Sequence, residues 1–458
     1  MRLIKCRAVN FMGLADLELD LDHDVVVLLA DNGVGKSSVL KAMRIALGSW
    51  LLGIQNGDSI PIKGWMMRYQ LKRLGYELVK DYIGPASVSA TAVLDGIGQV
   101  SWMRSRKVGD KTRTDRKDAN CIRDAATEFQ KLNLPLPLIA YYGARRRVPA
   151  NIKPKRTGPQ ARTAAYTGTL DSSIDFSMRF GRWWRLRDQA AQNTDARNVY
   201  DALGSTLSRL LPGVESIHFD PDFEEPLIEF QSDAAGGGER AFSSLSDGFQ
   251  NILSLGLDLA LRALQLNPEL GASAFSETPG VVLIDEIDQH LHPTWQLTVA
   301  KGFYEAFPKM QFIIATHSPL VALGSAQFAQ TVHLRADASG ARAVELESYV
   351  LGATVDETLR SEAFDLGSTW SPRILELLTK RSQLLEDQQK YPESDELSAS
   401  LRENALELEK YRSSPVLHTE DLIRLIIRDL AGDVAFLTPQ DLEALRRKAL
   451  ERIRSQAT

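Results

Sequence analysis

The sequence predicts an α/β protein with an inserted lobe and a C-terminal helical region. A buried strand at 25–29, a glycine-rich turn and an amphipathic helix from Lys36 follow one another without interruption. Two later apolar segments, 281–284 and 311–315, have the length of buried strands and end in polar residues. Apolar strands that alternate with helical segments are typical of a sheet covered by helices.

The N-terminal part of the chain predicts a hairpin followed by an insertion. A short apolar run spans Leu3 to Ala8, and leucines alternate with acidic residues from Leu17 to Leu21, as in a half-buried strand. From residue 50 to about 130 we expect an insertion that is helical at first. Its later part predicts paired strands at 88–94 and 99–103.

The middle of the chain continues the α/β alternation, and the tail differs from it. Strands are expected at 138–142, 217–219 and 227–230, and helices at 180–211, 248–266 and 295–307. We assign residues 1–350 to the main domain, including an inserted lobe with basic loops at about 50–240, and 351–458 to the helical region. The end helix, 438–458, has one apolar stripe, which suits either docking of a partner or packing on its own domain.

Composition favours a globular protein of the cytoplasm. The 458 residues suggest two or three packed units, and 44% of them are apolar. Two cysteines allow no disulfide framework, which fits a reducing compartment. The longest apolar runs have strand length, far below the roughly 20 residues of a membrane span. The net charge of −5 lies in the tail, where 20 acidic and 15 basic residues follow position 350.

The turn after the first buried strand has the pattern of a phosphate-binding loop. It reads Asp31-Asn32-Gly33-Val34-Gly35-Lys36-Ser37-Ser38. Its glycines let backbone N–H groups of residues 32–35 and of Ser38 face phosphate oxygens beside a helix N-terminus. Lys36 is expected to contact the β- and γ-phosphates of ATP, and Ser37 to bind Mg²⁺. Ala30 stands where the usual pattern has its first glycine, and we expect binding to be retained because alanine is small.

Two further strands are expected to end at the same nucleotide. Asp285 would hold Mg²⁺ through water, and Glu286 would accept a proton from the attacking water. His317 follows the strand at 311–315 and would hydrogen-bond the γ-phosphate. Taken alone, such a histidine is more often structural, and two acids at a strand end are often incidental. Their order after a phosphate-binding loop reverses this weighting.

A fourth segment, Ser246-Asp247-Gly248-Phe249-Gln250, opens a long helix. A hydroxyl and a glycine N–H at a helix start suit an anion, although in isolation the segment is only an N-cap. The four segments in this order resemble the P-loop ATPases of ATP-binding-cassette type, the heads of SMC-like and RecF-like proteins. The resemblance implies that Ser246, Gly248 and Gln250 reach the γ-phosphate held by a second copy of the chain, so that ATP closes a homodimer.

A narrower resemblance is carried by four further segments. These are Ile139-Ala140-Tyr141-Tyr142-Gly143, the run from Asp285 to Gln296, the run from Phe312 to Leu320, and the run from Phe364 to Pro372. They resemble the AAA-type ATPases of bacterial defence, a group that includes the Septu subunit PtuA and the ATPases of some retron systems. The resemblance implies an anti-phage role beside a separate effector, commonly an HNH nuclease such as PtuB.

The pattern departs from the cassette family at two positions. His292 stands where many members have the aspartate that contacts the dimer partner, so hydrolysis is expected to be slow. The glutamine of the Q-loop is not placed, and Gln55 and Gln70 are candidates. Asp288, His290 and His292 also have the spacing of a metal site, but Pro293 favours a structural turn.

Two basic segments, 104–117 and 145–162, are candidates for contact with DNA or RNA. A solvated surface is the more common role of such charge runs. Two other classes of function stay open beside defence. One is a RecF-like ATPase of DNA repair or chromosome maintenance, without a long coiled-coil arm because only about 210 residues separate Lys36 from Ser246. The other, weaker class is the ATPase of a transporter.

Overall fold

The computed structural model describes most of the chain. The described residues are 1–30, 33–55, 57–74, 76–109, 117–144, 161–171, 176–231, 238–337, 340–345, 355–361, 364, 366, 368–391 and 394–410. They fall into two compact units, which divide between Leu366 and Gly367. The first unit holds the α/β domain, and the second holds a pair of helices. A boundary after residue 350 was expected from the sequence.

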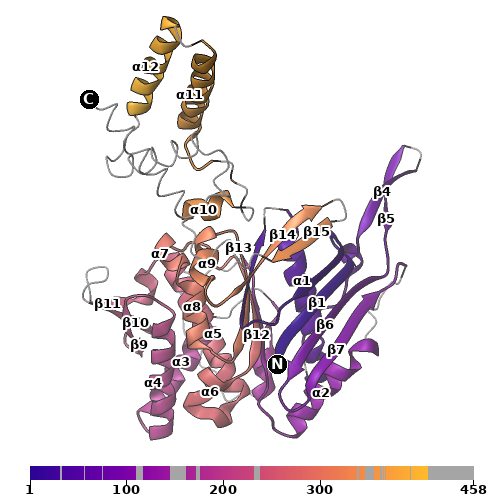
Figure 1. The fold of residues 1–458 in the computed structure, drawn as a ribbon. Coiled ribbons are helices and arrows are strands. Elements are labelled where there is room, and N and C mark those ends of the chain that lie inside the picture. The colour runs from indigo at the N-terminus through magenta and orange to yellow at the C-terminus, as the bar shows by residue number, and fades with distance from the viewer. Residues whose placement is uncertain are drawn as a thin grey trace. The chain divides into compact units, whose positions relative to one another are not determined.

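A six-stranded sheet forms the centre of the first unit (Figure 1). Its strands, in spatial order, are β15 (Gly340–Glu345), β14 (Gln330–Asp337), β3 (Val25–Ala30), β13 (Met310–Thr316), β12 (Gly280–Asp285) and β8 (Leu138–Tyr142). All neighbours are parallel except the β14–β15 pair. Every residue of β3, β12 and β13 is buried, as expected for parallel strands covered on both faces. The predicted α/β fold is confirmed.

A second sheet packs beside the central one, with the first helix between them (Figure 1). Its order is β2 (Leu14–Asp20), β1 (Arg2–Phe11), β6 (Ala86–Leu94) and β7 (Gly98–Arg106), all antiparallel. Helix α1 (Lys36–Leu47) contacts β1 and β6, and α2 (Asn120–Lys131) contacts β7. The predicted hairpin and the predicted strand pair at 88–94 and 99–103 therefore belong to one sheet.

The early part of the insertion was expected to be helical, and this prediction is wrong. Short 3-10 turns occupy η1 (Trp50–Gly53) and η2 (Gly64–Met66), and they are followed by a two-stranded ribbon. The ribbon consists of β4 (Tyr69–Leu74) and β5 (Glu77–Tyr82). The tyrosines, leucines and valine of the two strands stabilise the ribbon by cross-strand pairing. This pairing outweighs the helical propensity of leucine, lysine and glutamate.

Helices and a small sheet complete the first unit. The small sheet has the order β11 (Gly238–Ala241), β10 (Glu225–Phe230) and β9 (Val214–Asp220). The helices are α3 (Phe176–Ala190), α4 (Thr194–Arg209), α5 (Asp247–Leu266), α6 (Ala274–Glu277), α7 (Pro293–Gln296), α8 (Val299–Ala306), α9 (Pro319–Ser325) and α10 (Val355–Arg360). Further 3-10 turns are η3 (Lys117–Ala119), η4 (Arg162–Tyr166), η5 (Phe242–Ser244) and η6 (Pro268–Ser273). No helix within the described ranges is long and apolar enough to cross a membrane.

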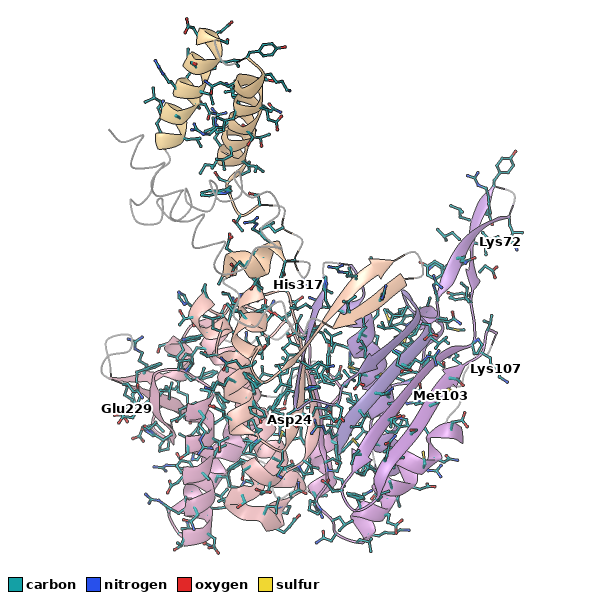
Figure 2. All side chains as sticks on the ribbon, in the orientation of Figure 1. Asp24, Lys72, Met103, Lys107, Glu229 and His317 are labelled. Atoms are coloured by element: carbon teal, nitrogen blue, oxygen red, sulfur yellow. The ribbon has the colours of Figure 1, made fainter. Side chains whose placement is uncertain are left out.

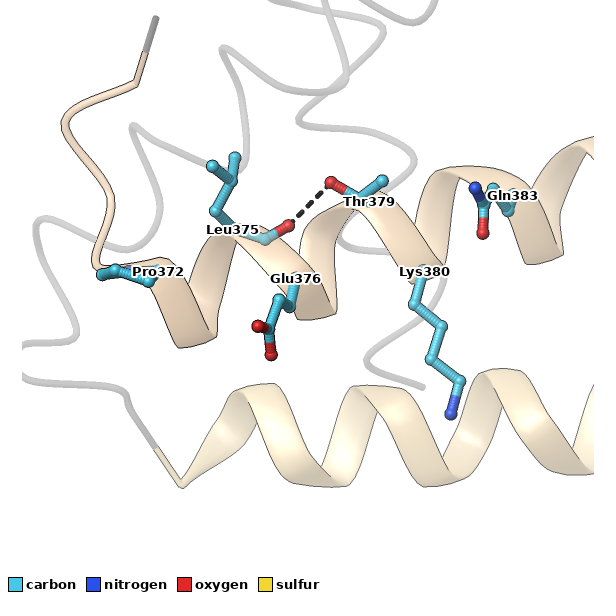
Figure 3. A pocket seen from close by; sticks show the side chains of 6 residues that line it. All are labelled: Pro372, Leu375, Glu376, Thr379, Lys380 and Gln383. Carbon is cyan, nitrogen blue, oxygen red and sulfur yellow. Dashed lines mark hydrogen bonds between the residues drawn. The ribbon is translucent and has the colours of Figure 1, made fainter. Parts of the chain in front are cut away.

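The second unit contains an antiparallel pair, α11 (Pro372–Lys390) and α12 (Asp395–Glu409). Asn404 is buried between them and donates to the Leu377 carbonyl at 3.0 Å. One side of α11 carries a shallow pocket of mixed polarity (Figure 3), lined by Pro372, Leu375, Glu376, Thr379, Lys380 and Gln383. The predicted helical character of the tail is confirmed for these elements. The expected end helix, 438–458, lies outside the described residues.

Candidate functional site

Three strands of the central sheet end side by side, and each is followed by one of the predicted motifs. β13 lies between β3 and β12, with Thr316 opposite Leu29 and Ala315 opposite Asp285. Parallel strands present their carboxyl ends at one edge of a sheet, and ligands of open α/β sheets bind at that edge. The sheet order therefore brings the phosphate-binding loop, the acidic pair and the histidine together.

The described part of the loop has the backbone that a phosphate cradle needs. Gly33 and Gly35 have φ values of 85° and 116°, in the left-handed region that favours glycine. Gly35 also accepts the N–H groups of Ser38 and Val39, each at 2.9 Å, and so begins α1. Asp31 and Asn32 lie outside the described residues. Ala30 is buried at the end of β3, and Val34 is half-buried.

Lys36 and Ser37 are the first two residues of α1, and their side chains have different environments. The Lys36 side chain is 7% exposed, and its ammonium donates to the Thr316 carbonyl at 3.0 Å. This bond joins the loop after β3 to the end of β13. Ser37 is exposed. β3 and β12 are separated by β13 alone, so their carboxyl ends lie about 10 Å apart.

The acidic pair combines a buried and a half-buried carboxylate. Asp285 is the last residue of β12 and is 7% exposed, whereas Glu286 is half-buried. Glu286 has a φ of 49°, which is uncommon for a residue with a side chain. Such backbone conformations persist where the surrounding structure imposes them, and they concentrate at functional sites.

His317 follows β13 at the same edge, where Figure 2 labels it. Its imidazole is hydrogen-bonded to the backbone of Ala30, the last residue of β3. Burial lowers the pKa of His317, and the charge of Lys36 lowers it further, against the opposing effect of Asp288 and Glu286. The neutral imidazole is therefore favoured near neutral pH.

A chain of hydrogen bonds fixes the segment that carries His317, and the sequence did not predict these bonds. The Thr316 hydroxyl donates to the Asp288 carboxylate and accepts the N–H of Ser318 at 2.9 Å. The Ser318 hydroxyl donates to the Gln296 amide oxygen at 2.6 Å, and the Gln296 amide donates to the Leu291 carbonyl at 2.9 Å. The loop after β12 and the loop after β13 thus form one hydrogen-bonded unit.

The segment 246–250, at the start of α5, also contacts this hydrogen-bonded unit. A Cβ atom at Gly248 would lie 2.2 Å from the His290 carbonyl oxygen, so only glycine permits this approach. Phe249 packs its ring against Trp295 at a centroid distance of 5.1 Å. Ser246, at the N-cap position of α5, is exposed. The Gln250 amide donates to the Leu245 and Phe242 carbonyls at 2.9 and 3.1 Å, and it therefore holds its own loop.

A buried ionic cluster joins α5 to β8. Asp258 is fully buried and accepts from Tyr142 at 2.6 Å and from Arg262 at 2.7 Å. Arg179 forms an ion pair with its other carboxylate oxygen. Burial raises the pKa of Asp258, but the charges of Arg179 and Arg262 outweigh this effect and bring the pKa to about 2. The spacing of Asp258 and Arg262 by four residues was visible in the sequence, whereas Arg179 and Tyr142 come from distant segments.

Several other predicted positions lie away from this edge. Gln55 is exposed after η1, and Gln70 is exposed on β4, so neither follows a strand of the central sheet. His292 is the N-cap of α7 and accepts the Thr294 N–H at 3.4 Å, a structural turn. Within the described ranges no group of three metal-ligating side chains occurs. Residues 110–116 and 145–160 of the basic segments lie outside the described residues.

Comparison with known proteins places these features in context. A family model described as "AAA domain, putative AbiEii toxin, Type IV TA system" matches residues 26–323. The retron Vc95 probable ATPase of Vibrio cholerae serotype O1 biovar El Tor is 25% identical over 360 residues, which are 66% of this chain and 67% of that protein. Septu protein PtuA of Bacillus mycoides (strain KBAB4) is 25% identical over 391 residues, 83% of this chain and 47% of that protein. The expected resemblance to this group is confirmed.

The matches also differ in how much of each protein they cover. The chain spans about half the length of the Bacillus mycoides PtuA, since the matched region is 47% of that protein. Among solved structures, the SMC head domain from Thermotoga maritima aligns with this chain over 76% of this chain and 100% of its own length. The two are 16% identical, and the TM-score is 0.44.

Proposed function

The chain belongs to the AAA-domain family whose model spans residues 26–323, and on that premise we propose that it binds and hydrolyses ATP as the sensor or regulatory subunit of an anti-phage defence system. The observation that carries the ATPase proposal is the convergence of three motifs at the ends of β3, β12 and β13. The names of the retron and Septu relatives support the defence role.

Each residue at the edge has a proposed task. Lys36 and the N–H groups of residues 32–35 bind the phosphates, and Ser37 with Asp285 holds Mg²⁺. Oxygen atoms of a hydroxyl and a carboxylate are the hard ligands that Mg²⁺ prefers, so the donor set fits the ion. Bound Mg²⁺ neutralises charge on the phosphates. Glu286 accepts a proton from water, and His317 donates a hydrogen bond toward the γ-phosphate.

We further propose that two copies of the chain share their sites. Ser246 is exposed at the start of α5, and Gly248 lies against the loop after β12, so a partner nucleotide would meet a surface already coupled to Glu286 and His317. Gln250 also supports this surface, because its amide holds the loop before α5, and it stays a predicted contact of the partner nucleotide. ATP-dependent dimerisation, measured by analytical ultracentrifugation, tests this point, and a protein that stays monomeric with ATP and Mg²⁺ would refute it.

The effector is proposed to be a separate nuclease that binds the C-terminal region. This assignment rests on the PtuA and retron relatives. It is tested by co-purification of the nuclease with the full chain and with a chain that lacks residues 438–458. Retention of the nuclease by the truncated chain would contradict docking at that segment.

Replacement of Lys36 by alanine is the primary test of the ATPase proposal. We expect ATP binding, followed by calorimetry, to be lost because the ammonium at the loop is removed. Lys41→Ala is the matched control: it removes one lysine from the same helix, and Lys41 lies over the Trp65 ring at 4.7 Å instead of at the loop. Equal affinity for ATP in Lys36→Ala and the parent chain would contradict the assignment of the site.

A further inference from the structure

The β4–β5 ribbon differs from every other sheet of the first unit in its exposure. Its two strands pair only with each other within the described residues, and all twelve of their residues are exposed. It projects from the rest of the unit, and Figure 2 labels Lys72 on it. An isolated two-stranded ribbon is marginally stable in water. A surface of this kind is expected to be covered by a binding partner.

The two faces of the ribbon have different charge. Opposed residues of an antiparallel pair share a face, and successive residues alternate between faces. The pairs Tyr69–Tyr82, Leu71–Lys80 and Arg73–Leu78 therefore form one face, which we call the cationic face. It contains two cations and no acid. The opposite face holds both acids of the ribbon, Glu77 and Asp81, together with Lys72.

The cationic face also carries exposed apolar and aromatic groups. Leu71 and Leu78 are each 63% exposed, and Tyr69 is 41% exposed. The Lys80 ammonium lies 4.4 Å from the Tyr69 ring centroid, which orders the lysine at the base of the ribbon. Two copies stacked through this face would place four cations, Arg73 and Lys80 of each copy, in one interface. Like charges disfavour that arrangement, so the complementary occupant is an anion.

We propose that the cationic face of the β4–β5 ribbon binds the major groove of duplex DNA. That groove is about 12 Å wide and admits a two-stranded β-ribbon. Six residues per strand extend about 17–20 Å, which exceeds the groove depth of about 8.5 Å. The tip of the ribbon can therefore reach the edges of the DNA bases while its opposite end stays beside the phosphates. Apolar side chains such as Leu71 and Leu78 suit contact with thymine methyl groups.

One further exposed basic residue, Lys107, lies near the base of the ribbon. A Cβ atom at Gly84, just after β5, would lie 2.5 Å from the Val108 side chain, so Lys107 is next to the base of the ribbon. Lys107 is exposed, and Figure 2 labels it. Arg104 and Arg106 of the same segment are held by Ser59, Ile60 and Ile62, so the contribution of the segment to this surface comes from Lys107. The deep, narrow major groove of A-form RNA excludes such an element, so DNA is preferred to duplex RNA.

Adjacent residues of β4 supply a matched test. Arg73→Gln and Lys72→Gln each remove one charge from the same strand, but on opposite faces. Affinity for a labelled DNA duplex is measured by fluorescence anisotropy over a range of salt, with the RNA duplex of the same sequence in parallel. We expect Arg73→Gln to weaken DNA binding by about tenfold and to reduce the salt slope by about one, and Lys72→Gln to change it less than about twofold.

Lys80→Gln, on the cationic face of the other strand, should reproduce the loss, and thermal unfolding verifies that each variant is folded. Equal losses in Arg73→Gln and Lys72→Gln, unchanged DNA affinity in Arg73→Gln, or equal affinity for duplex RNA would each overturn the proposal. A change of oligomeric state in Arg73→Gln with DNA affinity unchanged would assign the face to contact between copies instead. Lys36→Ala should bind DNA like the parent chain, so this test stands apart from the ATPase proposal.

Discussion

The Asp258 cluster and the carboxyl edge of the central sheet both place charged side chains inside the first unit, yet they differ in their access to solvent. Asp258 is fully buried, and two arginines and one tyrosine occupy its carboxylate. At the sheet edge, Glu286 is half-buried and Ser37 is exposed. A charge surrounded by protein donors stabilises one arrangement, whereas a charge with access to solvent can exchange its partner for a ligand. The Asp258 carboxylate therefore suits a structural role, and the Glu286 carboxylate suits a chemical one.

The largest effect should appear at the open edge, in the rate of ATP turnover. Glu286→Gln keeps the size of the side chain but removes the proposed proton acceptor. We expect hydrolysis to fall by about 10²–10⁴, the usual contribution of a general base, with ATP binding retained. The measurement is phosphate release under saturating ATP. Glu305→Gln, an exposed acid of α8 that pairs with Lys301, is the control. Normal turnover in Glu286→Gln would place the base elsewhere.

The closed cluster should respond in stability instead of turnover. Asp258→Asn leaves Arg179 and Arg262 buried without their counter-charge. Loss of one partner from a buried ion pair costs about 3–5 kcal/mol, which urea unfolding measures. Asp16→Asn, in an exposed pair with Arg7, should be indistinguishable from the parent chain. If the two variants unfold alike, Asp258 does not hold α5 to β8.

The same cluster predicts a pH dependence with a defined sign. The folded-state pKa of Asp258 is about 2, below its ordinary value of 3.8. A lowered pKa contributes stability that is fully present above the ordinary value and is lost as pH falls toward the folded value. The difference in stability between the parent chain and Asp258→Asn should therefore shrink between about pH 4 and pH 2. A constant difference over this interval would contradict the ion-pair explanation.

The two regions also differ in how far the sequence could predict them. The edge motifs are local: strand, glycine turn and helix succeed one another around Lys36, and Asp285 and His317 each end a continuous apolar run. The cluster needs Arg179 and Tyr142, whose approach to α5 depends on tertiary packing. The ribbon was missed for a related reason, because its leucines and charged residues also suit a helix and only pairing of β4 with β5 decides between them.

Gly248 lies on α5 and contacts the loop after β12, so it tests coupling between the Asp258 cluster and the sheet edge. The expected change in stability is smaller than for Asp258→Asn. Alanine there would place its Cβ 2.2 Å from the His290 carbonyl, so the loop after β12 or α5 must shift. We expect Gly248→Ala to cost about 1–3 kcal/mol in unfolding free energy and to reduce ATP-dependent dimerisation. Gly13→Ala is the control because nothing lies within 4 Å of the added atom. Equal stability of both variants would show that the approach is relaxed in solution.

The smallest effect should come from the hydroxyl that joins the two loops at the edge. Thr316→Val preserves shape but removes the donor to Asp288 and the acceptor for the Ser318 N–H. An unsatisfied buried group costs about 1–3 kcal/mol, and the lower part of that range applies because Asp288 is half-buried and can meet water. Thr316→Ser restores the hydroxyl and should recover the stability, which urea unfolding measures. Since Lys36 contacts the backbone carbonyl of Thr316, ATP affinity should stay unchanged in either variant. Unchanged stability in Thr316→Val, or an equal loss of stability in Thr316→Val and Thr316→Ser, would show that the hydroxyl does not set the geometry of the edge.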